Sequence, residues 1–267
     1  MRDAPHAPTP AARSFGSVAE DYDRWRPGLD PAVVDWLLPG PVERAIDVGA
    51  GTGKLARLLV GKASDLVCVE PDARMRAVLV RNVPGAIVRE GQGERIPVGD
   101  ASADAVLVAS AWHWMDHEAA VAEVARVLRP GAVLGVVWSG LDWTADWFET
   151  IRARVAGDPA VEPGSVLAAL VDRAVTDDQT HVLEFPAGAP FDPPERRGLT
   201  WERSMTAEDL VGLLGTVSGV IVLPDDRRRA VIAEARHLLR RYGGLDGDAV
   251  VTLPFRADCW RTRRTGA

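Results

Sequence analysis

A run of alternating glycines near residue 50 constrains the fold of this chain more than any other stretch. Residues 44–55 read Arg-Ala-Ile-Asp-Val-Gly-Ala-Gly-Thr-Gly-Lys-Leu. The small and β-branched residues at its start are typical of a strand that is covered on both faces. The glycines leave the next turn almost without side chains, so a ligand can lie against backbone N–H groups where the following helix begins. The stretch therefore predicts a strand, a ligand-binding turn and a helix.

The details of the turn decide between kinds of ligand. A triphosphate-binding loop needs a hydroxyl residue where Leu55 stands, which excludes that kind of site. The spacing of Gly51, Gly53 and Ala56 fits a dinucleotide loop loosely, so a nicotinamide or flavin enzyme remains an alternative. Asp47 lies directly before the glycines, where it would repel a pyrophosphate. A carboxylate there suits a ligand that carries an ammonium or sulfonium group.

The pattern Asp47-x-Gly49-x-Gly51-x-Gly53 resembles the first motif of class I S-adenosylmethionine (SAM) methyltransferases. The resemblance implies an α/β, Rossmann-like fold, namely a doubly wound, seven-stranded and mostly parallel sheet with an antiparallel last strand and a helical cap. It also implies that SAM is the cofactor and S-adenosylhomocysteine the product. Asp47, Gly49, Ala50 and Gly51 are expected to hold the amino-acid end of SAM.

An acidic residue at the end of the next predicted strand supports a ligand that contains a ribose. Residues 65–69 are the predicted second strand, and Glu70 ends it. An acid at this spacing from the glycine turn can accept hydrogen bonds from both ribose hydroxyls. It would repel the 2′-phosphate of NADP, whereas SAM and NAD both suit it. Pro71 follows directly and belongs with Glu70 to the predicted cofactor site.

The loop after the third predicted strand is expected to bind adenine. The strand covers residues 86–89, and Gln92, Gly93 and Glu94 follow it. The family that the sequence resembles usually has an acidic or small polar residue where Gln92 stands. A glutamine can still accept a hydrogen bond from the adenine amine and donate one to a ring nitrogen. All three residues are predicted cofactor contacts, and a solvated loop residue is the alternative for Gln92.

A predicted helix near the N-terminus ends at Pro27. Its aromatic residues recur at helical spacing, and the pattern Phe-Gly-x-x-Ala-x-x-Tyr-Asp-x-x-Arg-Pro resembles the lid of the trans-aconitate-methyltransferase-like branch. Tyr22 and Arg26 lie four positions apart, on one helical face. An arginine can grip a carboxylate, and a tyrosine ring can cover a sulfonium. Both residues are therefore expected to close over the methionine part of SAM, and simple packing on the domain is the alternative.

An aromatic segment follows the predicted central strand, residues 104–109. Ligands in open α/β sheets bind beyond the carboxyl ends of the strands, so this segment is expected to face the methyl group and the acceptor. The backbone of Ala111 is a predicted cofactor contact. His113 is the predicted catalytic residue, as a base or as a donor to the substrate, although a lone histidine is more often structural. The predicted substrate-pocket residues are Trp112, His113, Trp114, Trp138 and Trp143.

Composition narrows the choice of partners. The chain has 267 residues, of which 47% are hydrophobic, and a net charge of -7. The acidic balance argues against binding to nucleic acid or an anionic membrane, and no apolar run has membrane-spanning length. Two cysteines are too few for a disulfide framework or a zinc site, so no metal is implied. A cytoplasmic monomer or homodimer with a small-molecule acceptor is expected.

The chain divides into four predicted parts, which are a disordered leader (1–13), a SAM-binding core with its lid helix (14–140), a cap and substrate region (141–248), and the last core strand with a tail (249–267). Within the cap region, residues 181–185 and 198–205 resemble strands. The predicted function is SAM-dependent methyl transfer to a small molecule, at oxygen or else at nitrogen or carbon. The alternatives are an NAD-dependent oxidoreductase and a non-methylating SAM-binding cyclase or regulator.

Overall fold

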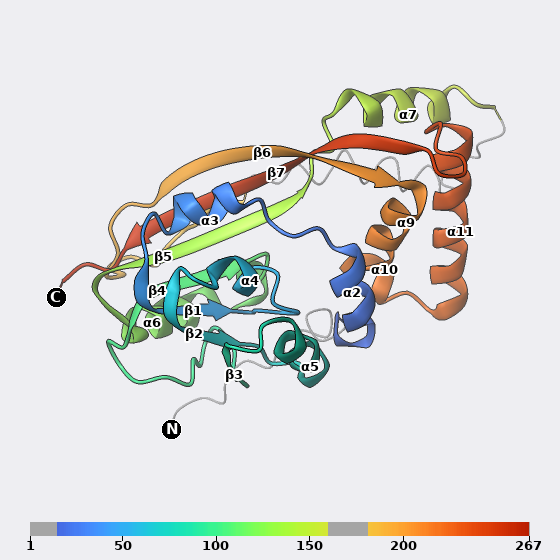
Figure 1. The fold of residues 1–267 in the computed structure, drawn as a ribbon. Coiled ribbons are helices and arrows are strands. Elements are labelled where there is room, and N and C mark those ends of the chain that lie inside the picture. The colour runs from blue at the N-terminus through green and yellow to red at the C-terminus, as the bar shows by residue number, and fades with distance from the viewer. Residues whose placement is uncertain (1–14, 160–180, 267) are drawn as a thin grey trace.

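A single seven-stranded sheet with the strand order β3-β2-β1-β4-β5-β7-β6 forms the centre of the molecule (Figure 1). The computed structural model describes residues 15–159 and 181–266, so the predicted leader lies outside the described residues. Neighbouring strands from β3 to β5 are parallel, and β7 runs antiparallel to both β5 and β6. The predicted mostly parallel sheet with an antiparallel last strand is confirmed. The strands are β1 (Val42–Val48), β2 (Ala63–Val69), β3 (Ile87–Arg89), β4 (Ala103–Ala109), β5 (Leu128–Leu141), β6 (Glu195–Thr206) and β7 (Val250–Arg263).

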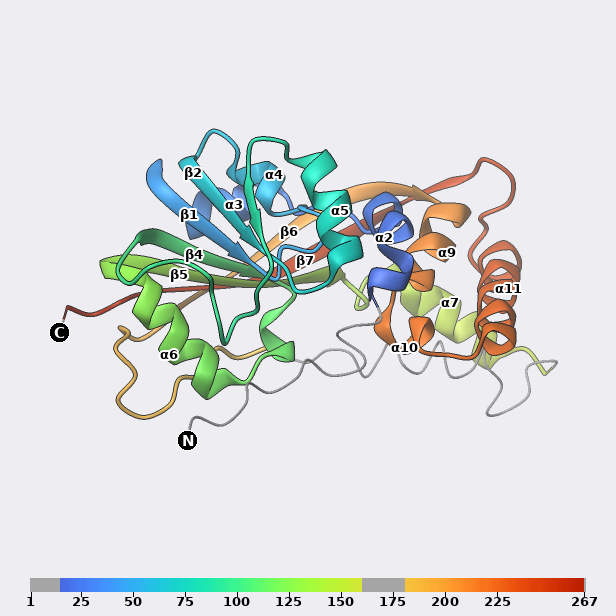
Figure 2. The same ribbon diagram turned by 90° about the horizontal axis from the view of Figure 1, so that it is seen from below.

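Helices cover both faces of the sheet (Figure 2). The helices α3, α4 and α5 pack on one face and α6 packs on the other. Side chains alternate along β1, so Ile46 and Val48 join the α6 layer while Ala45 joins the opposite layer. Asp47 points to the same side as Ala45. The bounds of these helices are α3 (Pro31–Leu37), α4 (Ala56–Leu59), α5 (Ala73–Asn82) and α6 (His117–Val127).

Three of these helices begin after an aspartate that caps the first turn. Asp30, Asp72 and Asp116 precede α3, α5 and α6, and each side chain accepts a hydrogen bond from a backbone N–H of that turn. Such a cap satisfies a donor that the helix itself leaves unpaired. Asp72 and Asp116 follow the ends of β2 and β4, so the caps also fix the loops at this edge of the sheet.

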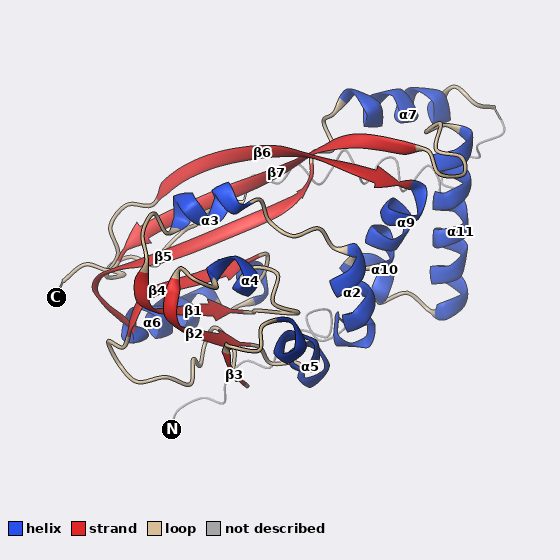
Figure 3. Ribbon diagram, in the orientation of Figure 1, coloured by secondary structure: helices blue, strands red, loops and turns tan. Residues whose placement is uncertain are grey.

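The long strands β5, β6 and β7 carry a helical cap at one end of the molecule (Figures 1 and 3). The cap has its own hydrophobic cluster, which includes Phe148, Leu210, Leu238 and Leu253. Thr206 and Asp209 form a capping box at the start of α9, in which each side chain accepts a hydrogen bond from the backbone N–H of the other residue. The cap helices are α7 (Asp146–Ala156), α9 (Ala207–Gly215), α10 (Ser218–Ile221) and α11 (Asp225–Arg241).

The N-terminal helix α2 (Ala19–Trp25) lies between the core and the cap (Figures 1 and 2). A 3-10 turn, η1 (Phe15–Val18), leads into it, and α2 contacts α5 on one side and α9 on the other. The first described helix of the chain therefore touches both parts of the molecule.

The structure corrects one strand prediction in the predicted cap region and confirms the other. Residues 181–185 form no strand. This segment is irregular, and apolar side chains from it pack against the α6 layer of the core. Residues 198–205 belong to β6, which pairs with β7 over its whole length and forms an edge of the central sheet.

Candidate cofactor and acceptor site

A cavity of about 140 Å³ lies at the carboxyl ends of β1, β2 and β4. This is the edge at which open α/β sheets bind ligands. All the predicted cofactor residues line it except Arg26, Asp47 and Ala50. The lining residues are Phe15, Tyr22, Gly49, Gly51, Glu70, Pro71, Asp72, Met75, Gln92, Gly93, Glu94, Ala109, Ser110, Ala111, Trp114, Met115 and Asp116.

The glycine turn needs its glycines for two different reasons. Gly49, Gly51 and Gly53 have φ values of +70°, +56° and +91°, in the left-handed region that favours glycine. A Cβ atom on Gly49 would lie 2.6 Å from the Cβ of Ala111, and one on Gly53 would lie 2.6 Å from Leu79 Cδ1. A Cβ on Gly51 would meet no described atom within 4 Å. The outer glycines therefore allow close packing, whereas the central one leaves its backbone open to the cavity.

Glu70 joins the end of β2 to the glycine turn. The Gly51 N–H donates to Glu70 Oε2 at 2.9 Å, and the Asp72 N–H donates to Oε1 at 2.9 Å. Burial raises the pKa of Glu70, and these two hydrogen bonds oppose that rise. Each carboxylate oxygen has a second lone pair. Glu70 can therefore hold the loop and still accept hydrogen bonds from a ligand's hydroxyl groups.

Asp47 lies beneath the turn and does not line the cavity. Its side chain is fully buried, and neither carboxylate oxygen has a hydrogen-bond partner among the described residues. Burial, and to a smaller extent the charge of Glu70, raise the pKa of Asp47 to about 8. The Ala56 backbone N–H lowers this pKa, although it does not meet the geometry of a hydrogen bond. An unpaired carboxyl group of this kind favours a positively charged ligand nearby. Ala50, the other motif residue absent from the cavity wall, is also buried.

The N-terminal segment supplies an aromatic wall. Tyr22 and Phe15 both line the cavity, with their ring centroids 5.8 Å apart and their planes nearly perpendicular. Arg26 lies behind this wall, with its guanidinium 5.6 Å from the Tyr22 ring centre. Its Nε donates to Thr216 Oγ1 at 2.9 Å and its Nη2 to the Thr216 carbonyl at 3.1 Å. Arg26 therefore ties α2 to the cap in this structure, and it does not face the cavity.

The predicted adenine loop closes another side of the cavity. Gln92 and Arg95 pair through their backbones, and the Asp116 N–H donates to Glu94 Oε1 at 2.7 Å. A Cβ on Gly93 would lie 2.2 Å from Met115 Sδ. The loop and the segment after β4 are therefore in direct contact, and Met115 fills the space between them.

Several lining residues were not predicted from the sequence. The position of Met115, directly after the aromatic segment, is a signal that could have indicated its place in the wall. Ser110 can be recognised as unusual only in the structure. It follows β4 and has a φ of +50°, which lies in the left-handed region that non-glycine residues rarely adopt. Its N–H donates to the Val137 carbonyl at 2.7 Å, which holds this strained backbone in place. The residues not predicted are Phe15, Asp72, Met75, Ala109, Ser110, Met115 and Asp116.

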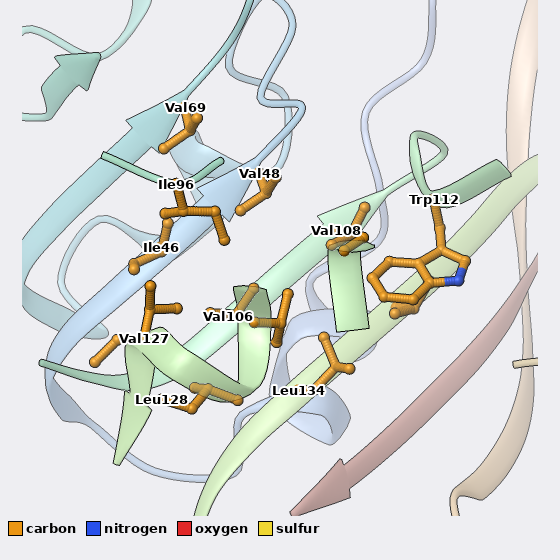
Figure 4. Close-up of a cluster of buried hydrophobic side chains, with 14 of the residues drawn as sticks. Ile46, Val48, Val69, Ile96, Val106, Val108, Trp112, Val127, Leu128 and Leu134 are labelled. Carbon is orange, nitrogen blue, oxygen red and sulfur yellow. The ribbon is translucent and has the colours of Figure 1, made fainter. Parts of the chain in front are cut away.

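The predicted substrate-pocket residues do not lie together in one pocket. Trp114 lines the cavity. Trp112 is only 1% exposed and packs among the valines and leucines between the sheet and α6, so the structure places it in the core and not in the cavity wall (Figure 4). Trp143 packs on Phe148 in the cap cluster, with ring centroids 4.6 Å apart. Trp112 and Trp143 pack in the nearest hydrophobic layers because burial there removes more of their apolar surface from water than a place in the cavity wall would.

Neither His113 nor Trp138 lines the cavity, and both belong to an aromatic cluster that adjoins it at Trp114. The buried Trp138 donates its indole N–H to His113 Nδ1 at 3.1 Å, and the His181 ring stacks on Trp138 with centroids 4.8 Å apart. Desolvation, with repulsion from His181 and His117, lowers the pKa of His113 from its ordinary value. Part of the His113 side chain remains exposed to solvent.

Two other kinds of site are absent from the described residues. Within residues 15–159 and 181–266, no group of three or more histidine, cysteine, aspartate or glutamate side chains could hold a metal ion. None of the helices in the same ranges has the length and apolar character needed to cross a membrane.

The sheet order, the glycine turn and the acidic end of β2 define a class I SAM-dependent methyltransferase fold. Residues 46–136 match a family model described as a methyltransferase domain. An uncharacterized methyltransferase of Mycobacterium tuberculosis is 36% identical over 250 residues, which cover 93% of this chain and 94% of that protein. The chain therefore belongs to this methyltransferase family.

Solved structures agree with the fold. The structure of a candidate type II methyltransferase from Anaeromyxobacter dehalogenans aligns with a TM-score of 0.62 and 24% identity, covering 91% of this chain and 99% of that one. A phosphoethanolamine N-methyltransferase from Haemonchus contortus, in complex with SAM, aligns with a TM-score of 0.50 and 14% identity over 96% of this chain and 60% of that one. The relationship to the methyltransferase of Mycobacterium tuberculosis favours a methyltransferase over the NAD-dependent alternative.

Proposed function

We propose that this protein transfers the methyl group of SAM to an oxygen atom of a small molecule. The observation that carries the proposal is the meeting of Glu70, the open face of Gly51 and the Tyr22 ring in one cavity at the carboxyl edge of the sheet. The Glu70 carboxylate can accept hydrogen bonds from hydroxyl groups, the Gly51 backbone allows a ligand to approach closely, and the Tyr22 ring offers an aromatic face to a cation.

The chemistry of the described residues fits SAM from one end to the other. Glu70 retains lone pairs for the ribose hydroxyls, and Gln92 is suited to adenine. The backbone around Gly51 accommodates the amino-acid end, next to the buried and unpaired carboxyl group of Asp47. The Tyr22 ring attracts a sulfonium through its negative face. The complex of the Haemonchus contortus methyltransferase with SAM supports the same cofactor for this chain.

The chain's own residues have a positioning role in the reaction. Bound SAM supplies a methyl group on a positively charged sulfur, which an oxygen nucleophile can attack directly. Aromatic and apolar side chains line the cavity and exclude water from the reacting atoms, and these are Phe15, Tyr22, Trp114 and Met115. The strained backbone of Ser110 fixes the end of β4 beside them. Alignment of two reactants in this way removes much of the entropic barrier to the reaction.

A small acceptor fits the charge and size of the site better than a macromolecule does. The net charge of -7 offers no general attraction for nucleic acid. The aromatic wall of Tyr22 and Phe15 closes one side of the cavity, so the site suits an acceptor that is small enough to enter the cavity completely.

The test is a pair of calorimetric titrations of the purified protein, one with S-adenosylhomocysteine and one with NAD. We expect micromolar binding of S-adenosylhomocysteine and none of NAD. Methyl uptake from radiolabelled SAM is then measured with a panel of small carboxylic acids and phenols. Binding of NAD alone would refute the proposal in favour of an oxidoreductase. Binding of S-adenosylhomocysteine without methyl transfer to any panel member would favour a non-methylating SAM binder.

A further inference from the structure

Building on the function proposed above, we propose that His113 acts as a hydrogen-bond donor to an oxygen of the acceptor, through Nε2, and not as a base. Trp138 is the positioning residue that imposes this role. The sequence leaves two roles open for His113, base and donor, and the hydrogen bond from Trp138 favours the donor role.

The hydrogen bond between the two rings fixes the tautomer of His113. An indole N–H can only donate, because it has no lone pair in the ring plane. The Trp138 N–H points at His113 Nδ1 from 3.1 Å, so that nitrogen must be the acceptor and carries no proton. A neutral imidazole has its single proton on the other nitrogen. His113 therefore presents an Nε2–H group, which donates and has no lone pair free to take a proton.

The surroundings keep the ring neutral. Protonation would put a hydrogen on Nδ1, directly against the indole N–H. The titratable groups that act on His113 are His181 and His117, and both disfavour a second positive charge there. His181 lies parallel to His113 with centroids 6.1 Å apart, and it also stacks on Trp138. The Trp138 side chain is only 7% exposed, and this burial holds its indole N–H in a fixed place.

The His113 ring adjoins the cavity wall through Trp114, although His113 itself is not among the residues that line the cavity. Ala111 and Trp114, on either side of His113 in the sequence, both line the cavity, and the Trp114 ring centroid is 4.6 Å from that of His113. The indole of Trp138 covers Nδ1, and His113 is solvent-exposed, so Nε2 is the nitrogen that remains available to a bound molecule.

This assignment restricts the class of acceptor. A site without a base at His113 suits an oxygen that is already ionised at neutral pH, as in a carboxylate or an acidic phenol. When a carboxylate is methylated, its oxygen forms the new bond to the methyl carbon, and the electron pair of the broken carbon–sulfur bond stays on sulfur. No proton moves in this step. The Nε2–H group then orients the acceptor by a hydrogen bond to one of its oxygens.

The first test reads the tautomer directly and needs no acceptor. Long-range ¹H–¹⁵N correlation spectra of the protein labelled at histidine nitrogens distinguish Nδ1–H from Nε2–H rings. We expect the Nε2–H form for His113 from pH 6 to pH 8, and loss of this preference in Trp138→Phe, which keeps the ring and removes the donor. An Nδ1–H ring in the unchanged protein, or an unchanged tautomer in Trp138→Phe, would overturn the proposal.

The second test separates donor from base by substitution, with methyl uptake by the panel of carboxylic acids and phenols as the readout. In His113→Gln the side-chain amide can place an N–H near the position of Nε2, whereas His113→Ala has no donor. We expect His113→Gln to keep turnover within about threefold and His113→Ala to lose about tenfold, the size of one hydrogen bond. Equal losses in the two variants would refute the donor role.

Calorimetry with S-adenosylhomocysteine keeps the two proposals apart. We expect unchanged affinity in both His113 variants, because the residue is assigned to the acceptor. If the unchanged protein did not bind S-adenosylhomocysteine, the proposed function would fail while the tautomer result would still stand. A tenfold loss of this affinity in His113→Ala would instead assign His113 to the cofactor and overturn the proposal.

Discussion

The substitution Gly51→Ala tests whether the cavity at the glycine turn is the cofactor site. An added Cβ would meet no described atom, so the protein can fold around it. The φ of +56° costs an alanine about 1–2 kcal/mol, part of which is regained because alanine has less conformational freedom than glycine in the unfolded chain. We therefore expect a loss of about 1 kcal/mol in the free energy of unfolding.

The effect on binding should be larger than the effect on stability. The new methyl group occupies the space in which the ligand approaches the backbone, and overpacking of this kind costs about 1–3 kcal/mol. Since 1.4 kcal/mol is a factor of ten, we expect S-adenosylhomocysteine to bind about 10- to 100-fold more weakly. The assay is titration calorimetry of the folded variant, with urea unfolding measured in parallel.

Gly61→Ala is the matched control. Gly61 has φ +83°, a Cβ on it would also meet no described atom, and it does not line the cavity. This variant should lose similar stability and bind S-adenosylhomocysteine as the unchanged protein does. Affinity in Gly51→Ala within twofold of the unchanged protein would refute the placement of the cofactor. Equal losses of affinity in the two variants would trace the effect to general destabilisation.

Three further predictions test the site and its support. Glu70→Gln should weaken S-adenosylhomocysteine binding at least tenfold by calorimetry, because an amide donates where the carboxylate accepts; unchanged affinity would contradict the ribose assignment. The pKa of Asp47, raised to about 8, means that its stabilising contribution is complete below about pH 4 and is lost as the pH rises toward 8. Asp47→Asn should therefore gain stability over the unchanged protein as the pH rises from 5 to 8 in thermal unfolding, and a constant difference would refute this. Gly212→Ala would place a Cβ 2.3 Å from the Trp25 ring and should lose about 1–3 kcal/mol in urea unfolding. Gly215→Ala, with its nearest neighbour at 3.6 Å, should be neutral, and similar losses in both would argue against the close contact between α2 and α9.

Local sequence patterns predicted the core of the fold and one side of the site. The strand, glycine turn and acid of Glu70 are close together in the chain, and their order constrains how they meet in space. The sheet that results places Gly49, Gly51 and Glu70 in one cavity, as predicted. The capping box at Thr206 is a local feature of the same kind, because its two partners are three residues apart.

The failures of prediction concern contacts between distant parts of the chain. Arg26 bonds to Thr216, 190 positions away, and no local pattern indicates this choice. Trp112 and Trp143 both belong to the predicted substrate pocket, yet each packs in the hydrophobic layer nearest to it. Trp112 lies in the core between the sheet and α6, and Trp143 lies in the cap. The hydrogen bond from Trp138 to His113 joins β5 to the segment after β4, so the tautomer of His113 can be read only once the two strands are placed side by side.

The position of α2 between core and cap has a thermodynamic consequence. Ala19 packs with Met75 and Val78 of α5, while Arg26 and Trp25 contact α9 of the cap. The same segment also contributes Tyr22 to the cavity wall, so the positions of the cap and of this wall depend on one helix. Linkage of this kind is reciprocal. Any acceptor that changes the affinity for the cofactor by shifting α2 must have its own affinity changed by the cofactor, by the same factor.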